Sequence, residues 1–173
     1  MRQKNHSLLL DGVTLGFRME EPAPDRMVRT IRSRDDSAAW WNENVEFFLD
    51  VTGRGEGEYY QFIINPNGAV YDSRLQDTNW DAEGTRVGVH VGTDFWSMEV
   101  HLPYGAFTDL VRPGTGVEWL GQFTRHRMSR MTATPGKGFD QKGETTGEYS
   151  RMNMRFGGGS NNQADFARLR FVE

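Results

Sequence analysis

The sequence of 173 residues predicts an all-β fold, an antiparallel β-sandwich of the jelly-roll or immunoglobulin-like kind with long loops. Three observations favour it. Most patterned segments alternate apolar and polar residues with period two, turn-forming residues separate them at intervals of roughly 8–15 residues, and no long segment has a helical period. We therefore expect about eight to ten short strands in one domain that spans residues 1–173.

Strand signals begin near the amino terminus. Gly12–Met19 alternates cleanly, and a turn with two prolines follows it at Glu21–Asp25. Met27–Ile31 is rich in β-forming residues, although its alternation is imperfect. Three further strands are expected, the last two of them joined by a tight Pro-Asn-Gly turn: Val45–Asp50, Tyr59–Asn65 and Ala69–Asp72.

The second half of the chain continues this pattern. Arg86–Val91 alternates, and Phe95–Leu102 alternates better still, before Pro103 ends it. Tyr104–Val111 has room for only a turn or two of helix. Two more strands are expected at Val117–Arg127 and Leu169–Val172, and between them Met128–Ser160 is polar, with no sustained period.

Composition and motifs exclude several functions. A net charge of −4 gives no basic footprint for nucleic acid, and the longest apolar run, Ala38–Trp41, is far short of the ~20 residues of a membrane span. The chain has no Cys, so disulfides and thiolate chemistry are excluded. Neither a nucleophile-elbow motif, a P-loop nor a zinc-protease motif occurs, and the four histidines form no pair with ligand spacing. We expect a protein that is not an enzyme.

The most informative segment contains two adjacent tryptophans. Arg34–Asp50 runs from a charged loop through Trp40 and Trp41 into a strand that carries Glu46. If this pair is extended, its two rings point to opposite faces, so one can be exposed beside polar groups. An exposed aromatic ring next to carboxylates and amides can stack on the apolar face of a sugar and bind its hydroxyls. The alternative is that both rings pack in the core or a loop.

Four ordered stretches resemble the family 9 carbohydrate-binding module and its wider relatives, the DOMON-like β-sandwich superfamily. They cover most of the chain, from Gly12 to Val172. The stretches are Trp40–Asp50, with a Val-Glu-x-Phe core; the tyrosine-rich strand YYQFIINPNG; WSMEVHLPYGAF; and Trp119–Arg125 with a closing FARLRF. The resemblance implies a β-sandwich that binds poly- or oligosaccharides without catalysis.

Site residues follow from this resemblance by motif. Trp40 matches the first of two tryptophans that sandwich a sugar, and Glu46 and Asn65 match residues that hold its hydroxyls. The pattern departs at Ile63, where well-known sugar binders have arginine, and at Ser160, where they have the second tryptophan. Trp41 or Trp80 is an alternative second aromatic surface. Gln122, which replaces an asparagine of the pattern, and Arg125 complete the candidate set.

Two weaker implications concern cofactors. The resemblance allows a structural calcium ion, although no cofactor is required, and ordinary solvated loop carboxylates are the alternative. A haem held by His126 and Met128 is not expected, because two residues on one strand face cannot straddle it. The candidate calcium ligands, near strand ends and loops, are Asp50, Asp72, Asp77 and Asp81.

The resemblance also predicts what kind of larger protein this chain belongs to and where that protein is located. Such modules are often fused to a catalytic domain, and the family's usual first strand is reduced here to His6–Asp11. We therefore expect this chain to be a piece of a longer protein that is secreted, periplasmic or on the cell surface, with its signal outside this sequence. A second interpretation is a structural or interaction domain, accessory to such a protein, whose sugar site is degenerate.

Overall fold

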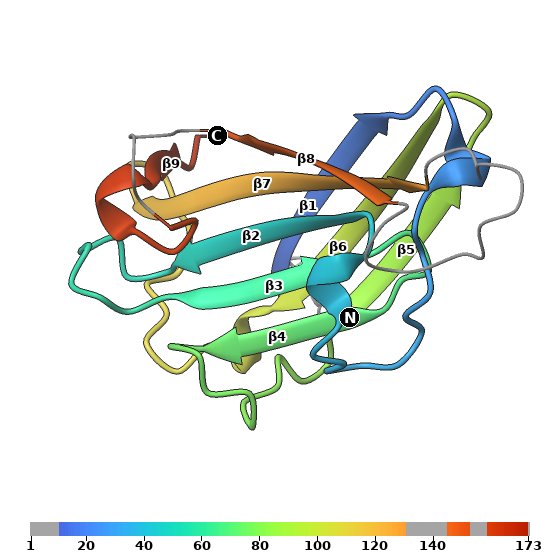
Figure 1. Cartoon of the computed structure of the whole chain (residues 1–173). Helices are drawn as coiled ribbons and strands as arrows, with labels where there is room; N and C mark the ends of the chain where they lie inside the picture. Colours follow the sequence, from blue (N-terminus) through green and yellow to red (C-terminus); the bar gives the residue numbers. More distant parts are fainter. Residues whose placement is uncertain (1–10, 131–144, 153–158, 173) are drawn as a thin grey trace, which may run out of the picture.

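Two antiparallel β-sheets pack face to face in the computed structural model, which describes residues 11–130, 145–152 and 159–172 (Figure 1). The predicted β-sandwich is confirmed. The smaller sheet has the order β1-β6-β5, and the larger has the order β4-β3-β2-β7-β8, with β9 also paired to β7. The strands are β1 Gly12–Glu20, β2 Asn44–Asp50, β3 Tyr60–Ile64, β4 Val70–Arg74, β5 Arg86–Val91, β6 Phe95–Pro103, β7 Glu118–Arg130, β8 Thr145–Arg151 and β9 Ala167–Arg170.

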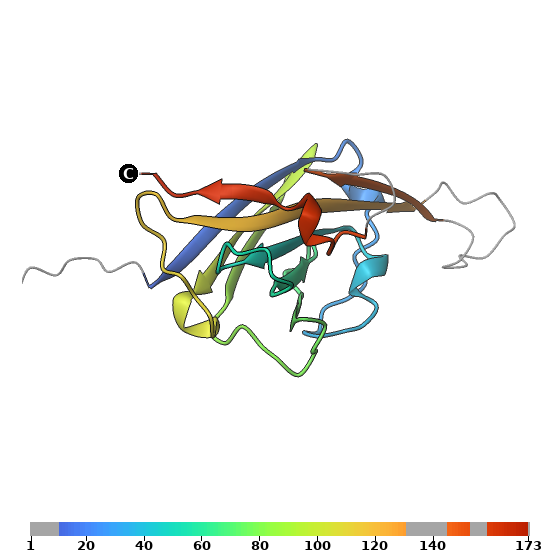
Figure 2. The same cartoon turned by 90° about the vertical axis from the view of Figure 1, so that its left-hand side faces the viewer.

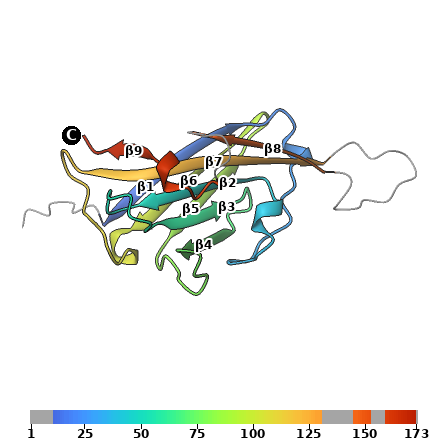
Figure 3. The ribbon, with the colours of Figure 1, turned by 60° about the vertical axis from the view of Figure 1, so that its left-hand side comes forward.

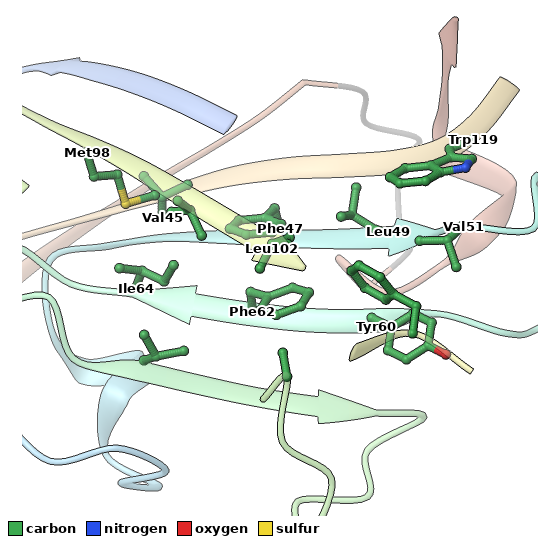
Figure 4. Close-up of a cluster of buried hydrophobic side chains, with 14 of the residues drawn as sticks. Val45, Phe47, Leu49, Val51, Tyr60, Phe62, Ile64, Met98, Leu102 and Trp119 are labelled. Atoms are coloured by element: carbon green, nitrogen blue, oxygen red, sulfur yellow. The ribbon is translucent and has the colours of Figure 1, made fainter. Parts of the chain in front are cut away.

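One face of each sheet forms the core between the layers. In β6 the four residues predicted to share a face, from Trp96 to Leu102, are all buried, and their neighbours in the strand are more exposed. Figure 4 shows Phe47 of β2 beside Phe62 of β3, and their rings stack with centroids 4.9 Å apart. Trp119 closes the core near the end of β2. Apolar burial between the sheets is therefore the main stabilising contribution.

The strands β2, β3 and β4 of the larger sheet are almost wholly buried. Every residue of β2 is buried, whereas β5 in the smaller sheet alternates between partly buried and exposed residues. Four short 3-10 turns accompany the strands: η1 Pro24–Arg26, η2 Ala39–Trp41, η3 Tyr104–Ala106 and η4 Gln163–Asp165. In Figure 1, η2 lies in front of β3 and β4, on the outward face of this sheet.

The strand β7 organises the outer half of the larger sheet. Its first residues pair with β9 and its later residues pair with β8, so both strands lie along one long neighbour (Figures 2 and 3). Figure 2 shows β9 in red above the orange β7. Along its other edge, β7 pairs with β2 in the register Glu46 to Thr124. The strands β8 and β9 therefore lie at the outer edge of the larger sheet, beyond β7.

Several predictions about local structure need correction. Met27–Ile31 is not a strand: it contacts β7 through one isolated bridge, between Met27 and Ser129. Tyr104–Val111, by contrast, contains the single short turn η3, in agreement with the expectation of at most a turn or two of helix. The strand β8 lies inside Met128–Ser160, where no strand was expected. The closing strand is β9, two residues earlier than Leu169–Val172.

Within the described residues, no helix has the length and apolar character needed to cross a membrane.

Candidate functional site

A hollow of about 490 Å³ opens on the outward face of the larger sheet. Strand alternation explains its composition, because side chains between the core positions of β2, β3, β4 and β7 must point outward. The register aligns Phe48 with both Gln61 and Gln122, and Glu46 with Ile63 and Thr124. The lining residues are Trp40, Glu46, Phe48, Gln61, Tyr71, Gln76, His126, Ser160 and Asn161.

The floor of the hollow is a hydrogen-bonded chain centred on Glu46. The amide Nε2 of Gln61 donates to one carboxylate oxygen of Glu46 at 2.7 Å, and Nε2 of His126 lies 3.2 Å from the other. The hydroxyl of Ser73 donates in turn to the amide oxygen of Gln61 at 3.2 Å. Glu46 is only 3% exposed. Its carboxylate is therefore held in place by neighbours on both adjacent strands.

Aromatic rings form one wall. Trp40 in η2 packs on Tyr71 of β4 with ring centroids 4.7 Å apart and planes tilted by 59°. Beneath them lie Ala39 and Ile63, which form with Tyr71 a small apolar cluster separate from the main core. Burial, and next the charge of Asp35, raise the pKa of Tyr71, so its hydroxyl keeps its proton near neutral pH. The wall thus offers a fixed indole ring and a phenol that can donate.

The opposite wall is polar. Ser160 and Asn161 precede η4, and Asn161 donates through Nδ2 to the hydroxyl of Tyr59 at 3.3 Å. Gln76 reaches the same hydroxyl at 3.5 Å. Beyond the floor, Tyr149 of β8 packs edge-on against His126 with centroids 4.6 Å apart, and it is 59% exposed. Tyr149 is therefore a second accessible aromatic ring on this face of the sheet.

Two of the predicted sugar-binding residues, Trp40 and Glu46, line the hollow. Ser160, at the position where well-known sugar binders have the second tryptophan, lines it too. The tryptophans are not extended, as one expectation supposed, because they form the 3-10 turn η2. Trp41 does not line the hollow, although it is 68% exposed. Gln122 faces the same side as Phe48 but is buried, and its amide nitrogen lies 3.5 Å from the carbonyl oxygen of Asp165.

The remaining three predicted residues serve the fold. Asn65 is buried and stabilises its own turn, since its side-chain oxygen accepts from the backbone N–H groups of Asn67 and Ala69. Trp80 packs on the core rings of Tyr60 and Phe62, on the other face of the sheet. Arg125 points away from the hollow. These three residues therefore lie outside the lining of the hollow.

Arg125 belongs to a buried ionic cluster at the edge between the sheets. Its guanidinium donates to Glu43 at 2.7 Å and to Glu21 at 3.2 Å, and Glu43 also accepts from the indole N–H of Trp96 at 3.0 Å. Burial opposes ionisation of Glu21, but hydrogen bonds from Arg127 and the charges of both arginines lower its pKa overall. This cluster ties the end of β1 to the larger sheet.

The four predicted calcium ligands do not gather at one place. Asp72 and Asp81 lie with Asp35 in a group whose carboxylate oxygens are within 4.8 Å of one another. Arg34 stands among them, 2.6 Å from Asp72, and so supplies positive charge where a cation would bind. Asp50 accepts from backbone N–H groups of its own turn, and Asp77 accepts from Asn79 at another turn. These contacts do not fit a calcium site formed by the four predicted residues.

Six lining residues were not predicted from the sequence: Phe48, Gln61, Tyr71, Gln76, His126 and Asn161. Strand alternation could have found Gln61 and Tyr71, because each occupies an outward position in a predicted strand. His126 has the same parity as Gln122 in β7 and could have been found in that way. No local signal marks Gln76 or Asn161, since both belong to loops.

Comparisons with known proteins address the fold. No family model and no curated protein matches the sequence. Among solved structures, the chain is similar to a family 9 carbohydrate-binding module from Caldicellulosiruptor kristjanssonii in complex with cellotriose, with a TM-score of 0.62 and 13% identity over 92% of this chain and 69% of that one. A family 9 module from the same organism in complex with glucose has a TM-score of 0.60 and 14% identity, over 94% of this chain and 72% of that one.

The chain is also similar to a crystal structure from Bacteroides uniformis, of a protein proposed to bind carbohydrate, with a TM-score of 0.64 and 17% identity over 94% of this chain and 74% of that one. At these identities the comparisons concern the fold. They confirm that the chain has the fold of family 9 carbohydrate-binding modules, as the motifs predicted.

Proposed function

We propose that this protein binds a carbohydrate, without catalysis, in the hollow on the outward face of the larger sheet. The observation that carries the proposal is the pairing of a partly exposed indole, Trp40, with a floor of carboxylate, amide and imidazole groups in one hollow. A pyranose presents an apolar C–H face and a rim of hydroxyls, which match these two surfaces. The fold similarity to sugar-bound modules supports the same conclusion.

In this proposal each side of the sugar has a defined partner. The ring stacks on Trp40, whose orientation is held by Tyr71. Hydroxyls donate to the oxygens of Glu46, which keep free lone pairs after accepting from Gln61. Ser160 and Asn161 supply further polar contacts from the opposite wall. The site is therefore one-sided in its aromatic stacking.

The lining argues against glycoside hydrolysis. Hydrolysis by the common mechanism needs two carboxyl groups at a defined separation. Among the described residues that line the hollow, Glu46 is the only carboxylate. We therefore propose a binding module. Its partners would be poly- or oligosaccharides, and it would act outside the cytoplasm beside a fused catalytic domain.

One feature favours the second interpretation, an interaction domain with a degenerate sugar site. Ile63 is fully buried under Trp40, at the position where the resembling sugar binders place an arginine. An apolar side chain there offers no hydrogen bond to a ligand. The two interpretations differ in one measurable property, which is sugar affinity.

The test is a titration followed on the tryptophan indole signals of the ¹⁵N-labelled protein. We would add glucose, cellotriose and xylotriose and record the five indole N–H resonances. Binding in the hollow predicts a shift for Trp40, while the buried Trp96 and Trp119 serve as internal controls that stay fixed. If no sugar shifts any indole signal at millimolar concentration, the interaction-domain interpretation is favoured and the proposal fails.

A further inference from the structure

The carboxylate at the floor of the hollow differs from the other buried glutamates in its partners. Glu21 and Glu43 are buried too, and each accepts hydrogen bonds from an arginine. Glu46 is also buried, yet among the described residues it is hydrogen-bonded to the neutral amide of Gln61 and to the imidazole of His126. A buried carboxylate that has no arginine or lysine partner is costly, and it attracts a cation that can reach it.

The hydrogen-bonding groups around Glu46 leave mainly acceptors free. With the proton of a neutral imidazole on Nε2, His126 donates to Glu46 and leaves Nδ1 as an acceptor, and Nδ1 is buried without a partner among the described residues. The amide of Gln61 is engaged at both ends, by Glu46 and by Ser73. A ligand that reaches this floor therefore gains most by bringing donors.

The aromatic wall adds to the same preference. The Trp40 ring, supported by Tyr71, lines the hollow that also contains Glu46. The faces of indole and phenol rings carry negative electrostatic potential and attract ammonium groups. No lysine or arginine is among the described lining residues. The hollow thus combines one buried negative charge with electron-rich rings and has no fixed cation to oppose a positive ligand.

We propose that the preferred ligands are amino sugars with a free ammonium group, such as 2-amino-2-deoxy-hexoses, rather than neutral hexoses. This inference rests on the proposed function and deepens it. The ammonium provides three donors and the counter-charge for Glu46, while the C–H face of the same ring stacks on Trp40. N-acetylation removes the charge, and a uronate brings a second negative charge to Glu46. Both changes weaken binding.

The test compares four probes by calorimetry at pH 7 in one buffer: glucosamine hydrochloride, glucose, N-acetylglucosamine and glucuronate. We expect glucosamine to bind about tenfold more tightly than glucose, since a partly screened charge pair near Glu46 is worth about one power of ten in affinity. N-acetylglucosamine should lose that advantage, and glucuronate should bind most weakly. Equal or weaker binding of glucosamine relative to glucose overturns the inference and leaves the proposed function standing. If none of the four binds, both fail.

The variant Glu46→Gln keeps the shape and removes the charge. It should bring the affinity ratio of glucosamine to glucose close to one, whereas Glu99→Gln, an exposed glutamate on β6 of the other sheet, should leave the parent ratio unchanged. A parent-like ratio in Glu46→Gln overturns the assignment to Glu46. If Glu46→Gln does not fold, the salt dependence of binding by the parent protein provides the test instead. The affinity of the parent for glucosamine should fall between 20 mM and 500 mM NaCl while that for glucose holds, and a ratio independent of salt overturns the inference.

Discussion

Truncation of Trp40 to alanine is the sharpest test of how the hollow binds its ligand. The indole lines the hollow and packs on Tyr71, so Trp40→Ala removes the stacking surface from the ligand. Stacking of a planar ligand on one aromatic side chain is worth about 1–3 kcal/mol in nucleic-acid binding, which we take as the scale for a sugar ring. The expected loss of affinity is therefore about 5- to 150-fold.

The same truncation should cost little stability. Trp40 belongs to the small cluster on the outward face and not to the main core between the sheets. Loss of its ring pair with Tyr71 removes about 0.5–1.5 kcal/mol beyond the buried area. For a domain of this size, the loss of the ring pair alone corresponds to a fall in Tm of roughly 1–6 °C, to which the loss of the area buried by Trp40 adds. The variant should fold, so its binding can be measured.

The neighbouring residue provides the matched control. Trp41 belongs to the same turn, is 68% exposed and does not line the hollow. Calorimetric titration of the best-binding sugar should give a parent-like affinity for Trp41→Ala and a weakened one for Trp40→Ala. Equal affinities for Trp40→Ala and the parent would refute the stacking argument. A loss confined to Trp41→Ala would move the site to the outside of the turn.

Three further predictions concern stability and its pH dependence. Phe47→Ala, in the fully buried stack of rings, should lower the free energy of unfolding by about 3–5 kcal/mol in urea titrations, and a loss below 1 kcal/mol would contradict the assigned core. Gly53→Ala should destabilise by more than about 1 kcal/mol, because φ is +70° and the added Cβ would clash with the carbonyl oxygen of Glu118; a parent-like Tm would contradict this. Burial raises the pKa of Asp72 from 3.8 to about 6, so the folded state binds the proton more tightly and stability should fall as pH rises from about 4 to 6. Thermal melts of Asp72→Asn at several pH values should lack this pH-dependent contribution to stability, which is at most about 3 kcal/mol. If the variant and the parent lose stability equally between about pH 4 and 6, Asp72 is not the group responsible.

Strand prediction succeeded where the two faces of a strand meet different environments. The alternation in Phe95–Leu102 marks its buried face directly, because period two reflects one core-facing and one outward side. It failed for β8, whose residues Thr145–Arg151 carry no apolar alternation. That strand forms because β7 is long enough to offer its edge beyond β9, and such pairing is non-local. The opposite error occurs at Met27–Ile31, where a strand was expected from high β-propensity. This segment forms only one isolated bridge, between Met27 and Ser129.

By itself the sequence determined the sandwich and most of its core, and it pointed to Trp40 and Glu46, which line the hollow. These follow from periodicity and from a local motif, and both are properties of neighbouring residues along the chain. Tertiary structure alone decided which polar groups remain free for a ligand. Asn65 and Arg125 have the chemistry for sugar binding, but the fold uses their hydrogen bonds in a turn and in an ionic cluster. Whether a buried polar group is satisfied depends on partners far away in sequence, and for that reason only the folded chain identifies Glu46 as the charge at the floor of the hollow.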